Sequence, residues 1–260
     1  MKIISFTLIG LFMSLIIAAQ PETSPDLVTD RPDQTESATL IPKGFFQVET
    51  GFVFEGDEND GFKENNLGLF TTLLRYGVNE NFELRLGSAF LNSTQQEKGT
   101  ESSDVSGLAP LFVGMKFKML EENGLIPKMA FLVSTQFPNT GNKEFSPEYL
   151  ATDMRFNIEY SLTERFGLGA NLGVRWDGSN VKPEALYSLV LGIGVSDRLS
   201  VFIESYGYLP QEEMSDHRLD AGITFLLKNN LQIDASAGVG LSDISPDYFI
   251  NAGLSWRIPN

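Results

Sequence analysis

The residue types of a hydrolytic centre occur together once in this chain, around its only histidine, His217. In the stretch SDHRLD (residues 215–220), Ser215 and His217 are two positions apart and would share one face of a strand. A nucleophile and its base must meet within hydrogen-bonding distance, while a third group orients the base. His217 is followed by Arg218 and Leu219, so no serine completes a His-x-Ser arrangement. We therefore predict no catalytic residue and interpret His217 as a polar residue where a loop meets a strand.

Two further patterns resemble ligand-binding motifs but lack the context that such motifs need. GLGANLG (residues 167–173) resembles a dinucleotide-binding glycine loop, yet it lies inside an alternating segment and no helix follows. Acidic stretches such as EGDENDGFKEN (residues 55–65) offer oxygen ligands for Ca²⁺, but their spacing matches no defined calcium loop. The absence of Cys excludes thiolate metal sites and Cys nucleophiles. We expect neither a metal nor a cofactor.

The larger chemical signal is a set of charged residues that recur at every second position. Glu83 and Arg85 alternate with leucine, and Lys116 and Lys118 flank Phe117. Because successive side chains of a strand point to opposite faces, these charges would share one face. Both signs occur along the same face, as in a channel interior where acids and bases pair. The residues expected to line a transport path are Glu49, Arg75, Glu83, Arg85, Lys116, Lys118, Arg155, Glu159, Arg175, Glu204, Asp220 and Asp234.

The alternating segments that carry these charges come in pairs joined by short polar turns. Residues 73–90, 189–207 and 226–242 each contain a strand, a tight turn and a second strand. Longer acidic connections, such as residues 55–65 and 92–107, separate the pairs. Strict alternation of short and long connections is typical of membrane barrels with short periplasmic turns and longer extracellular loops. The twelve expected strands begin near Gly44, Leu67, Phe82, Leu108, Lys128, Thr152, Phe166, Glu184, Leu199, His217, Leu231 and Tyr248.

The second face of these strands is apolar and carries no charge. Residues 166–176, for example, place Phe166, Leu168, Leu172 and Val174 on one side. A Lys or Arg there would cost about 2–4 kcal/mol at the middle of a bilayer. A soluble β-sandwich would show the same alternation with its apolar face inside, and this alternative stays open. Because the pattern extends evenly over every strand, we predict an all-β, up-and-down antiparallel transmembrane β-barrel of about 12 strands over residues 43–260.

Composition and the first residues indicate export. The formal net charge of −15 argues against a nucleic-acid partner, which would need a basic surface. Residues 1–20 carry one Lys, an apolar run and then Ala18 and Ala19, as a cleaved secretory signal peptide does. No later segment reaches the roughly 18 uncharged apolar residues of a membrane helix. We expect the mature chain in an outer membrane.

Residues 21–42 precede the first expected strand and have two possible roles. Pro32 argues against a strand in this region. Its charged residues could fold into the barrel as a plug that pairs with the internal charges, or the stretch could be a solvated periplasmic leader. The candidate plug residues are Asp30, Arg31, Asp33 and Glu36.

Five stretches are similar to a known family. They are TDRPDQTESATLIPKGFFQVETGF (residues 29–52), LLRYGVNENFELRLG (residues 73–87), DGSN (residues 177–180), DHRLDAG (residues 216–222) and LQIDASAGVGLSDISPDYFINAGLS (residues 231–255). The family that they resemble consists of outer-membrane β-barrel proteins labelled transporters or products of a phenol-degradation (MetA) pathway. The resemblance spans residues 28–256. It implies an outer-membrane location and passage of small, aromatic or hydrophobic compounds, and it supplies no catalytic residues.

We expect a non-enzymatic barrel for passive transport or uptake of small molecules. Its expected partners are outer-membrane lipid, a small-molecule solute and the outer-membrane assembly machinery. Side chains fill a barrel of about eight strands, whereas 16–18 strands leave an open channel, so twelve permit either state. The alternative is therefore a closed structural or adhesive barrel whose acidic loops bind an external partner.

Overall fold

The computed structural model describes residues 26–179 and 181–258, which form an all-β structure with a single 3₁₀ turn at Lys143–Phe145. The expected signal peptide, residues 1–20, lies outside the described residues. None of the helical structure within the described ranges is long and apolar enough to cross a membrane. The strands are β1 (Phe46–Asn59), β2 (Phe62–Asn79), β3 (Phe82–Glu97), β4 (Thr100–Leu108), β5 (Phe112–Leu120), β6 (Lys128–Gln136), β7 (Ala151–Ser161), β8 (Phe166–Trp176), β9 (Glu184–Gly194), β10 (Leu199–Leu209), β11 (Asp216–Lys228), β12 (Leu231–Gly240) and β13 (Tyr248–Ile258).

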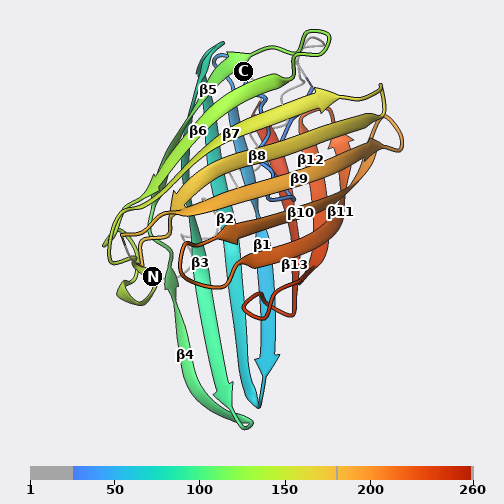
Figure 1. Cartoon of the computed structure of the whole chain (residues 1–260). Helices are drawn as coiled ribbons and strands as arrows, with labels where there is room; N and C mark the ends of the chain where they lie inside the picture. Colours follow the sequence, from blue (N-terminus) through green and yellow to red (C-terminus); the bar gives the residue numbers. More distant parts are fainter. Residues whose placement is uncertain (1–25, 180, 259–260) are drawn as a thin grey trace, which may run out of the picture.

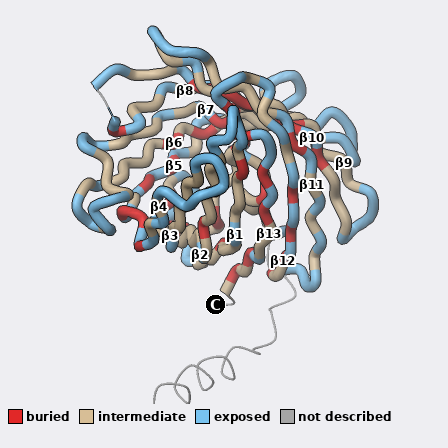
Figure 2. Tube along the Cα trace, turned by 90° about the horizontal axis from the view of Figure 1, so that it is seen from below, coloured by how far each residue is buried: buried red, intermediate tan, exposed pale blue. Residues whose placement is uncertain are grey.

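The strands form one antiparallel meander that closes on itself (Figure 1). Closure joins β1 to β13, from the pair Phe46 and Ile258 to the pair Gly56 and Tyr248. Seen from below, the strands run around the barrel, with β1 beside β13 (Figure 2). A closed sheet leaves no strand edge to lipid, which cannot pair with backbone groups. Twelve strands make the barrel wall, as predicted, because β4 pairs only with the outer part of β3.

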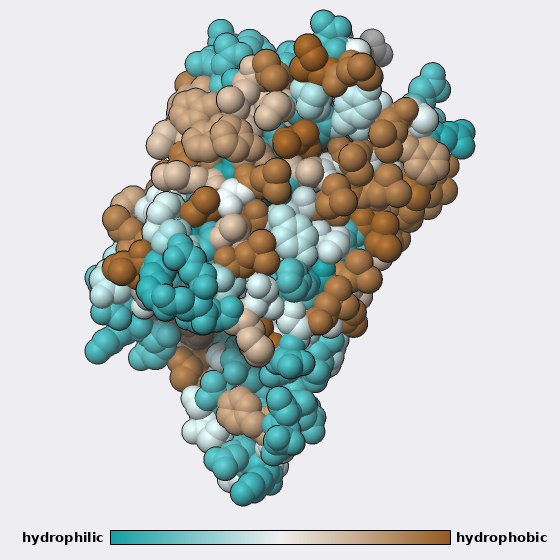
Figure 3. Space-filling model, in the orientation of Figure 1, coloured by the Kyte–Doolittle hydropathy of each residue, from teal (hydrophilic) through white to brown (hydrophobic). Residues whose placement is uncertain are grey.

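The alternation of polar and apolar residues separates the two faces of the wall. On β12, Gln232 and Asp234 are buried, whereas Ile233 is 40% exposed on the outside and Val239 45%. Apolar side chains likewise cover much of the barrel wall in Figure 3, and polar ones gather at the lower tip. Since the buried side is ionic and the exposed side is apolar, the prediction of a transmembrane barrel is confirmed and the soluble sandwich is excluded.

The prediction of an acidic loop is wrong for two segments. The wall strands continue through them beyond the barrel. Residues 55–65 extend β1 and β2, and residues 92–107 extend β3 and form β4. We call residues 55–66 and 92–107 the flap; it points downward in Figure 1. As a result β2 has 18 residues and β3 has 16, beyond the 9–11 that cross a bilayer. Flap residues are mostly polar on both faces, so the apolar periodicity that marks a strand is missing there.

Candidate functional site in the barrel lumen

Residues 26–42, which we call the N-terminal segment, run inside the barrel rather than outside it. Backbone N–H groups of the segment donate to wall carboxylates: Asp30 to Glu49 at 2.9 Å and Ile41 to Glu83 at 2.8 Å. From β13, which pairs with β1, the amide of Asn251 donates to the carbonyl of Pro32 at 3.0 Å. Side chains of the wall strands thus satisfy the irregular backbone, which inside a membrane requires such partners.

Asp30 of the segment lies among three positively charged side chains of the wall. Its Oδ2 lies 2.9 Å from Arg75 Nη1, 3.1 Å from Arg85 Nη2 and 3.1 Å from Lys116 Nζ. Burial by itself would raise the pKa of Asp30, but the attraction of Arg75, Lys116 and Arg85 outweighs it and holds the pKa far below its ordinary value. This carboxylate therefore stays ionised within a ring of three cations from β2, β3 and β5.

The barrel wall contributes two carboxylates to the same cluster. Arg75 pairs with Glu49 at 2.9 Å and with Glu83 at 2.7 Å, and all three side chains are fully buried. Glu36 of the segment accepts two hydrogen bonds from Arg85, at 2.6 and 3.1 Å. Predicted path residues and predicted plug residues are thus in direct contact in one ionic network.

Arg31 lies against a different part of the wall. Its Nη2 is 3.1 Å from Asp234 Oδ1 and 3.4 Å from Asn251 Oδ1. The guanidinium rests on Gly51 and Gly253, which face each other across β1 and β13. A Cβ at Gly253 would be 2.4 Å from Arg31, and one at Gly51 would be 2.6 Å away. These two glycines provide the space that the arginine occupies.

The tip of the segment, residues 33–35, crosses to β10 and β9. Gln34 N donates to Glu204 at 2.8 Å, and the Thr35 hydroxyl contacts both Glu204 and Ser188. Burial and the neighbouring Glu204 carboxylate raise the pKa of Asp33 well above its ordinary value of 3.8. Asp220 is the register partner of Glu204 on β11. The tip of the segment therefore lies near the carboxyl groups of Glu204 and Asp220, whereas Asp30 lies among cations.

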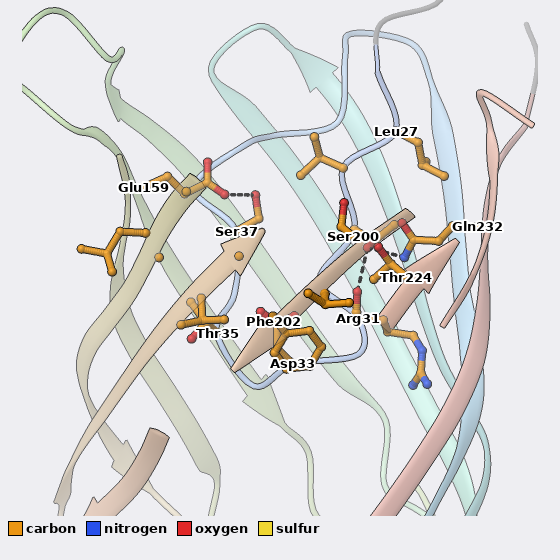
Figure 4. Close-up of a pocket in the computed structure, with 18 of the residues that line it drawn as sticks. Leu27, Arg31, Asp33, Thr35, Ser37, Glu159, Ser200, Phe202, Thr224 and Gln232 are labelled. Carbon is orange, nitrogen blue, oxygen red and sulfur yellow. Dashed lines mark hydrogen bonds between the residues drawn. The ribbon is translucent and has the colours of Figure 1, made fainter. Parts of the chain in front are cut away.

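Two cavities flank the segment. The larger, which we call the inner vestibule, has a volume of about 500 Å³ and lies towards the short turns. Figure 4 shows Arg31, Asp33 and Thr35 of the segment next to Ser200, Phe202 and Thr224 of β10 and β11, which line the same cavity. Outside the segment, its lining combines charged residues with small or apolar ones. The charged residues are Glu122, Lys128, Glu159, Asp197 and Arg198, and the small or apolar ones include Gly167, Gly169, Val190, Gly192, Ser200, Phe202 and Thr224.

The second cavity, the outer vestibule, has a volume of about 270 Å³ and lies towards the long connections. It is lined by Gln34 of the segment and by Tyr206, Tyr208, Arg175 and Arg218 of the wall. The Arg175 guanidinium stacks 3.8 Å from the Tyr208 ring centroid. Because residues of the same segment line both vestibules, the segment stands between the two ends of the lumen.

The remaining predicted path residues also point inward, and three of them pair with a neighbouring residue of the wall or its rim. Lys118 contacts Glu121 at the short-turn rim, Arg155 contacts Asp153, and Arg175 contacts Glu184. Glu159 accepts a hydrogen bond from Ser37 of the segment at 2.8 Å. The structure brings together nearly all the predicted path residues around the segment, and it leaves Lys118 at the edge.

The sequence prediction missed the amide side chains that hold the backbone of the segment. Asn171 accepts from Glu36 N at 2.8 Å and donates to Glu36 O at 2.9 Å. Asn157 donates to Ser37 O at 3.0 Å. An uncharged amide at an inward position in the centre of a strand could have indicated such a contact, but an analysis based on charge overlooks it.

His217 is the second residue of β11, next to the loop that precedes this strand. Its Nδ1 is 2.9 Å from the Tyr187 hydroxyl, and both side chains flank Gly207 on the outer face of the wall. Asp216, which might have oriented the ring, instead accepts hydrogen bonds from Arg218 and Ser245. Among the described residues, no group of three or more acidic or histidine side chains is placed to hold a metal ion.

Comparison with known proteins places this architecture among bacterial barrels. None of the curated proteins matches the sequence. The outer membrane channel COG4313 from Pseudomonas putida F1 superposes with a TM-score of 0.70 at 14% identity, covering 87% of this chain and 98% of that one. The translocator domain of the autotransporter NalP from Neisseria meningitidis gives 0.56 at 14% identity, covering 84% and 90%. The KdgM porin gives 0.50 at 8% identity, covering 79% and 98%.

These structural likenesses show the fold alone. The sequence itself matches the family described as "Putative MetA-pathway of phenol degradation" over residues 29–258, which include the N-terminal segment and the whole barrel. The chain belongs to that family.

Proposed function

We propose that this protein is a non-enzymatic outer-membrane channel for passive passage of small molecules, and that the N-terminal segment closes its resting state. The proposal rests on one observation above all. A closed barrel with an ionic interior contains two vestibules, and one segment of the same chain lines both of them. A structure that only needed stability would gain little from two such cavities, since unfilled space reduces packing.

The composition of the inner vestibule favours small, partly apolar solutes. Phe202 and Val190 offer an apolar surface, and Ser200 and Thr224 supply hydroxyls beside it. Pockets of this kind orient a mostly apolar ligand with a few polar groups. A monocyclic aromatic compound with one polar substituent matches this lining and the description of the family.

Two groups of side chains would control passage. Asp30, Arg31, Asp33 and Glu36 would act as the plug, because each lies in the segment between the vestibules. Rings of charge set the ion preference of pores. We assign that role to the path residues Glu49, Arg75, Glu83, Arg85, Lys116, Lys118, Arg155, Glu159, Arg175, Glu204, Asp220 and Asp234.

Export through a cleaved signal peptide (residues 1–20) and insertion by the outer-membrane assembly machinery complete the proposal. The exposed apolar wall would then contact outer-membrane lipid, with the flap outside the cell and the short turns in the periplasm.

Liposome swelling tests the proposal with solutes of graded size and polarity. We expect slow swelling with the wild-type protein and fast swelling with a variant that lacks residues 26–37, for neutral sugars and small aromatic alcohols alike. Strand content by circular dichroism must be unchanged in the variant. Impermeability of both correctly folded proteins would contradict a channel function.

A closed structural or adhesive barrel is the second candidate. The dense hydrogen bonding of the segment favours it, and so does the acidic flap, whose residues Asp57, Glu58 and Glu64 lie beyond the barrel. In that case the deletion variant would lose stability without gaining permeability.

A further inference from the structure

Arg85 and Lys116 are neighbouring cations on the inner wall that form ion pairs with acids of the N-terminal segment. They extend from β3 and β5, where Glu83 is the register partner of Lys116. Both side chains are buried. Within the part of the chain that the structure describes, the carboxylates that form ion pairs with them are those of Asp30 and Glu36. Both acids belong to the N-terminal segment.

The neighbouring arginine shows the contrast. Arg75 has two wall carboxylates, Glu49 and Glu83, at 2.9 and 2.7 Å. Three cations and two carboxylates give this part of the wall one net positive charge before the segment is counted. A buried charge without a partner is strongly unfavourable, so the wall requires a carboxylate from elsewhere.

Asp30 supplies that carboxylate, and Glu36 adds a second one that is replaceable. Its side chain is 22% exposed, whereas that of Asp30 is 2% exposed. It accepts two hydrogen bonds from the Arg85 guanidinium, in the bidentate geometry that an arginine forms with any carboxylate. The Glu36 side chain can rotate away while Asn171 still holds its backbone. A free carboxylate could then accept the same two hydrogen bonds.

We propose that Arg85 and Lys116 form a binding site for the carboxylate of a small organic acid, which displaces the side chain of Glu36. Glu36 occupies the site in the resting state as an internal substitute for the solute. The inference rests on the proposed passage of small solutes and names one solute class, small monocarboxylates. Exchange between Glu36 and a solute moves an anion past the cations without leaving them unpaired.

Fluorine NMR of the refolded mature chain in micelles tests this site directly. The probes are 4-fluorobenzoate and its neutral analogue 4-fluorobenzamide. We expect saturable line broadening with the benzoate and none with the benzamide. Glu36→Gln should lower the half-saturating benzoate concentration about tenfold, because a charge-assisted competitor is lost. Arg85→Gln should abolish the broadening, and Glu164→Gln, an exposed turn substitution, should leave it unchanged.

Equal responses to the two probes, or an unchanged affinity in the Glu36→Gln variant, would overturn the proposal. Tighter binding in that variant cannot arise from misfolding, so the test does not depend on the stability of Arg85→Gln. The readout is binding, not permeation. A protein that binds benzoate but passes no solute contradicts the proposed channel alone, and one that passes neutral solutes without distinguishing the probes contradicts the carboxylate site alone.

Discussion

Asp30 is the residue on which the ionic network of the lumen depends. It contacts Arg75, Arg85 and Lys116 within 3.1 Å, and its side chain is almost fully buried. Removing one partner from a buried network is costly because the remaining charges stay buried. The residue therefore couples the N-terminal segment to the stability of the barrel.

Asp30→Asn should lower the free energy of unfolding by about 3 kcal/mol, the usual cost of breaking a buried ion pair. Urea unfolding of the protein in micelles, followed by tryptophan fluorescence, measures the change. Asp60→Asn is the matched control, since Asp60 is exposed in a flap turn with φ of 50°, which Asn tolerates. Equal midpoints for the two variants would show that Asp30 carries no special role.

Gly253 is a second residue with a specific requirement. A methyl group there would lie 2.4 Å from Arg31 and would push its guanidinium away from Asp234. We expect Gly253→Ala to weaken docking of the segment by about 1–3 kcal/mol, as overpacking does. Faster thermolysin cleavage before Leu40, quantified by mass spectrometry, would report the release.

Gly192→Ala is the control for that experiment. Gly192 also faces the lumen, but a Cβ there would have its nearest neighbour at 3.9 Å. If both alanine variants were cleaved at the wild-type rate, the contact between Arg31 and the glycines would have no part in docking.

At the scale of elements, the N-terminal segment is held by opposite charges on its two sides. Cations of β2, β3 and β5 surround Asp30, whereas Glu204 and Asp220 of β10 and β11 lie by the tip. The pKa of Asp30 is lowered and that of Asp33 is raised. The two sides should therefore respond differently to pH.

Asp33 should make docking weaker as pH rises. The released side chain loses its proton near its ordinary pKa of about 4, while the docked one keeps it to higher pH. Below about pH 4, Asp33 therefore does not oppose docking of the segment. As the pH rises from about 4 to the raised pKa, the free energy of docking becomes progressively less favourable. Asp30 stabilises docking fully at any pH above its ordinary pKa. This stabilisation is lost only in more acidic solution, as the pH falls towards the lowered pKa.

We expect channel opening in planar bilayers to be more frequent at pH 8 than at pH 5. Asp33→Asn should remove this difference, because the amide does not titrate. Persistence of the same pH trend in Asp33→Asn would assign it to other groups.

The elements differ in how far their sequences reveal them. The wall strands were predictable because one face meets lipid and the other meets the lumen, and this difference imposes alternation on segments such as residues 231–240. The strands of the flap were not predictable, because both faces of the flap are in contact with water. The alternation of polar and apolar residues could not predict the contact between Asp30 and Lys116 either, since these residues are 86 positions apart and meet across the lumen. Mixed charges on inward positions predicted pairing, but not which acid would pair with which base.

At the scale of the whole molecule, the barrel separates an apolar exterior from an ionic interior. Leu172 is 56% exposed near the middle of β8, where hydrocarbon would cover it. Leu172→Arg should cost about 2–4 kcal/mol, the cost of an arginine near the bilayer midplane. Unfolding of the protein in lipid bilayers measures this cost.

Leu125→Arg is the matched control, because Leu125 is 92% exposed in the turn between β5 and β6. It should change the unfolding free energy little. If arginine were tolerated equally at both positions, the apolar wall would not contact lipid.

The claim that the N-terminal segment closes a channel is tested most directly by the current through single molecules. The wild-type protein and a variant without residues 26–37 are inserted into planar bilayers under identical salt and voltage. We predict brief, infrequent openings for the wild type and a steady, ohmic conductance for the variant. A correctly folded variant that stays silent, or one whose current matches the wild type, would contradict the account.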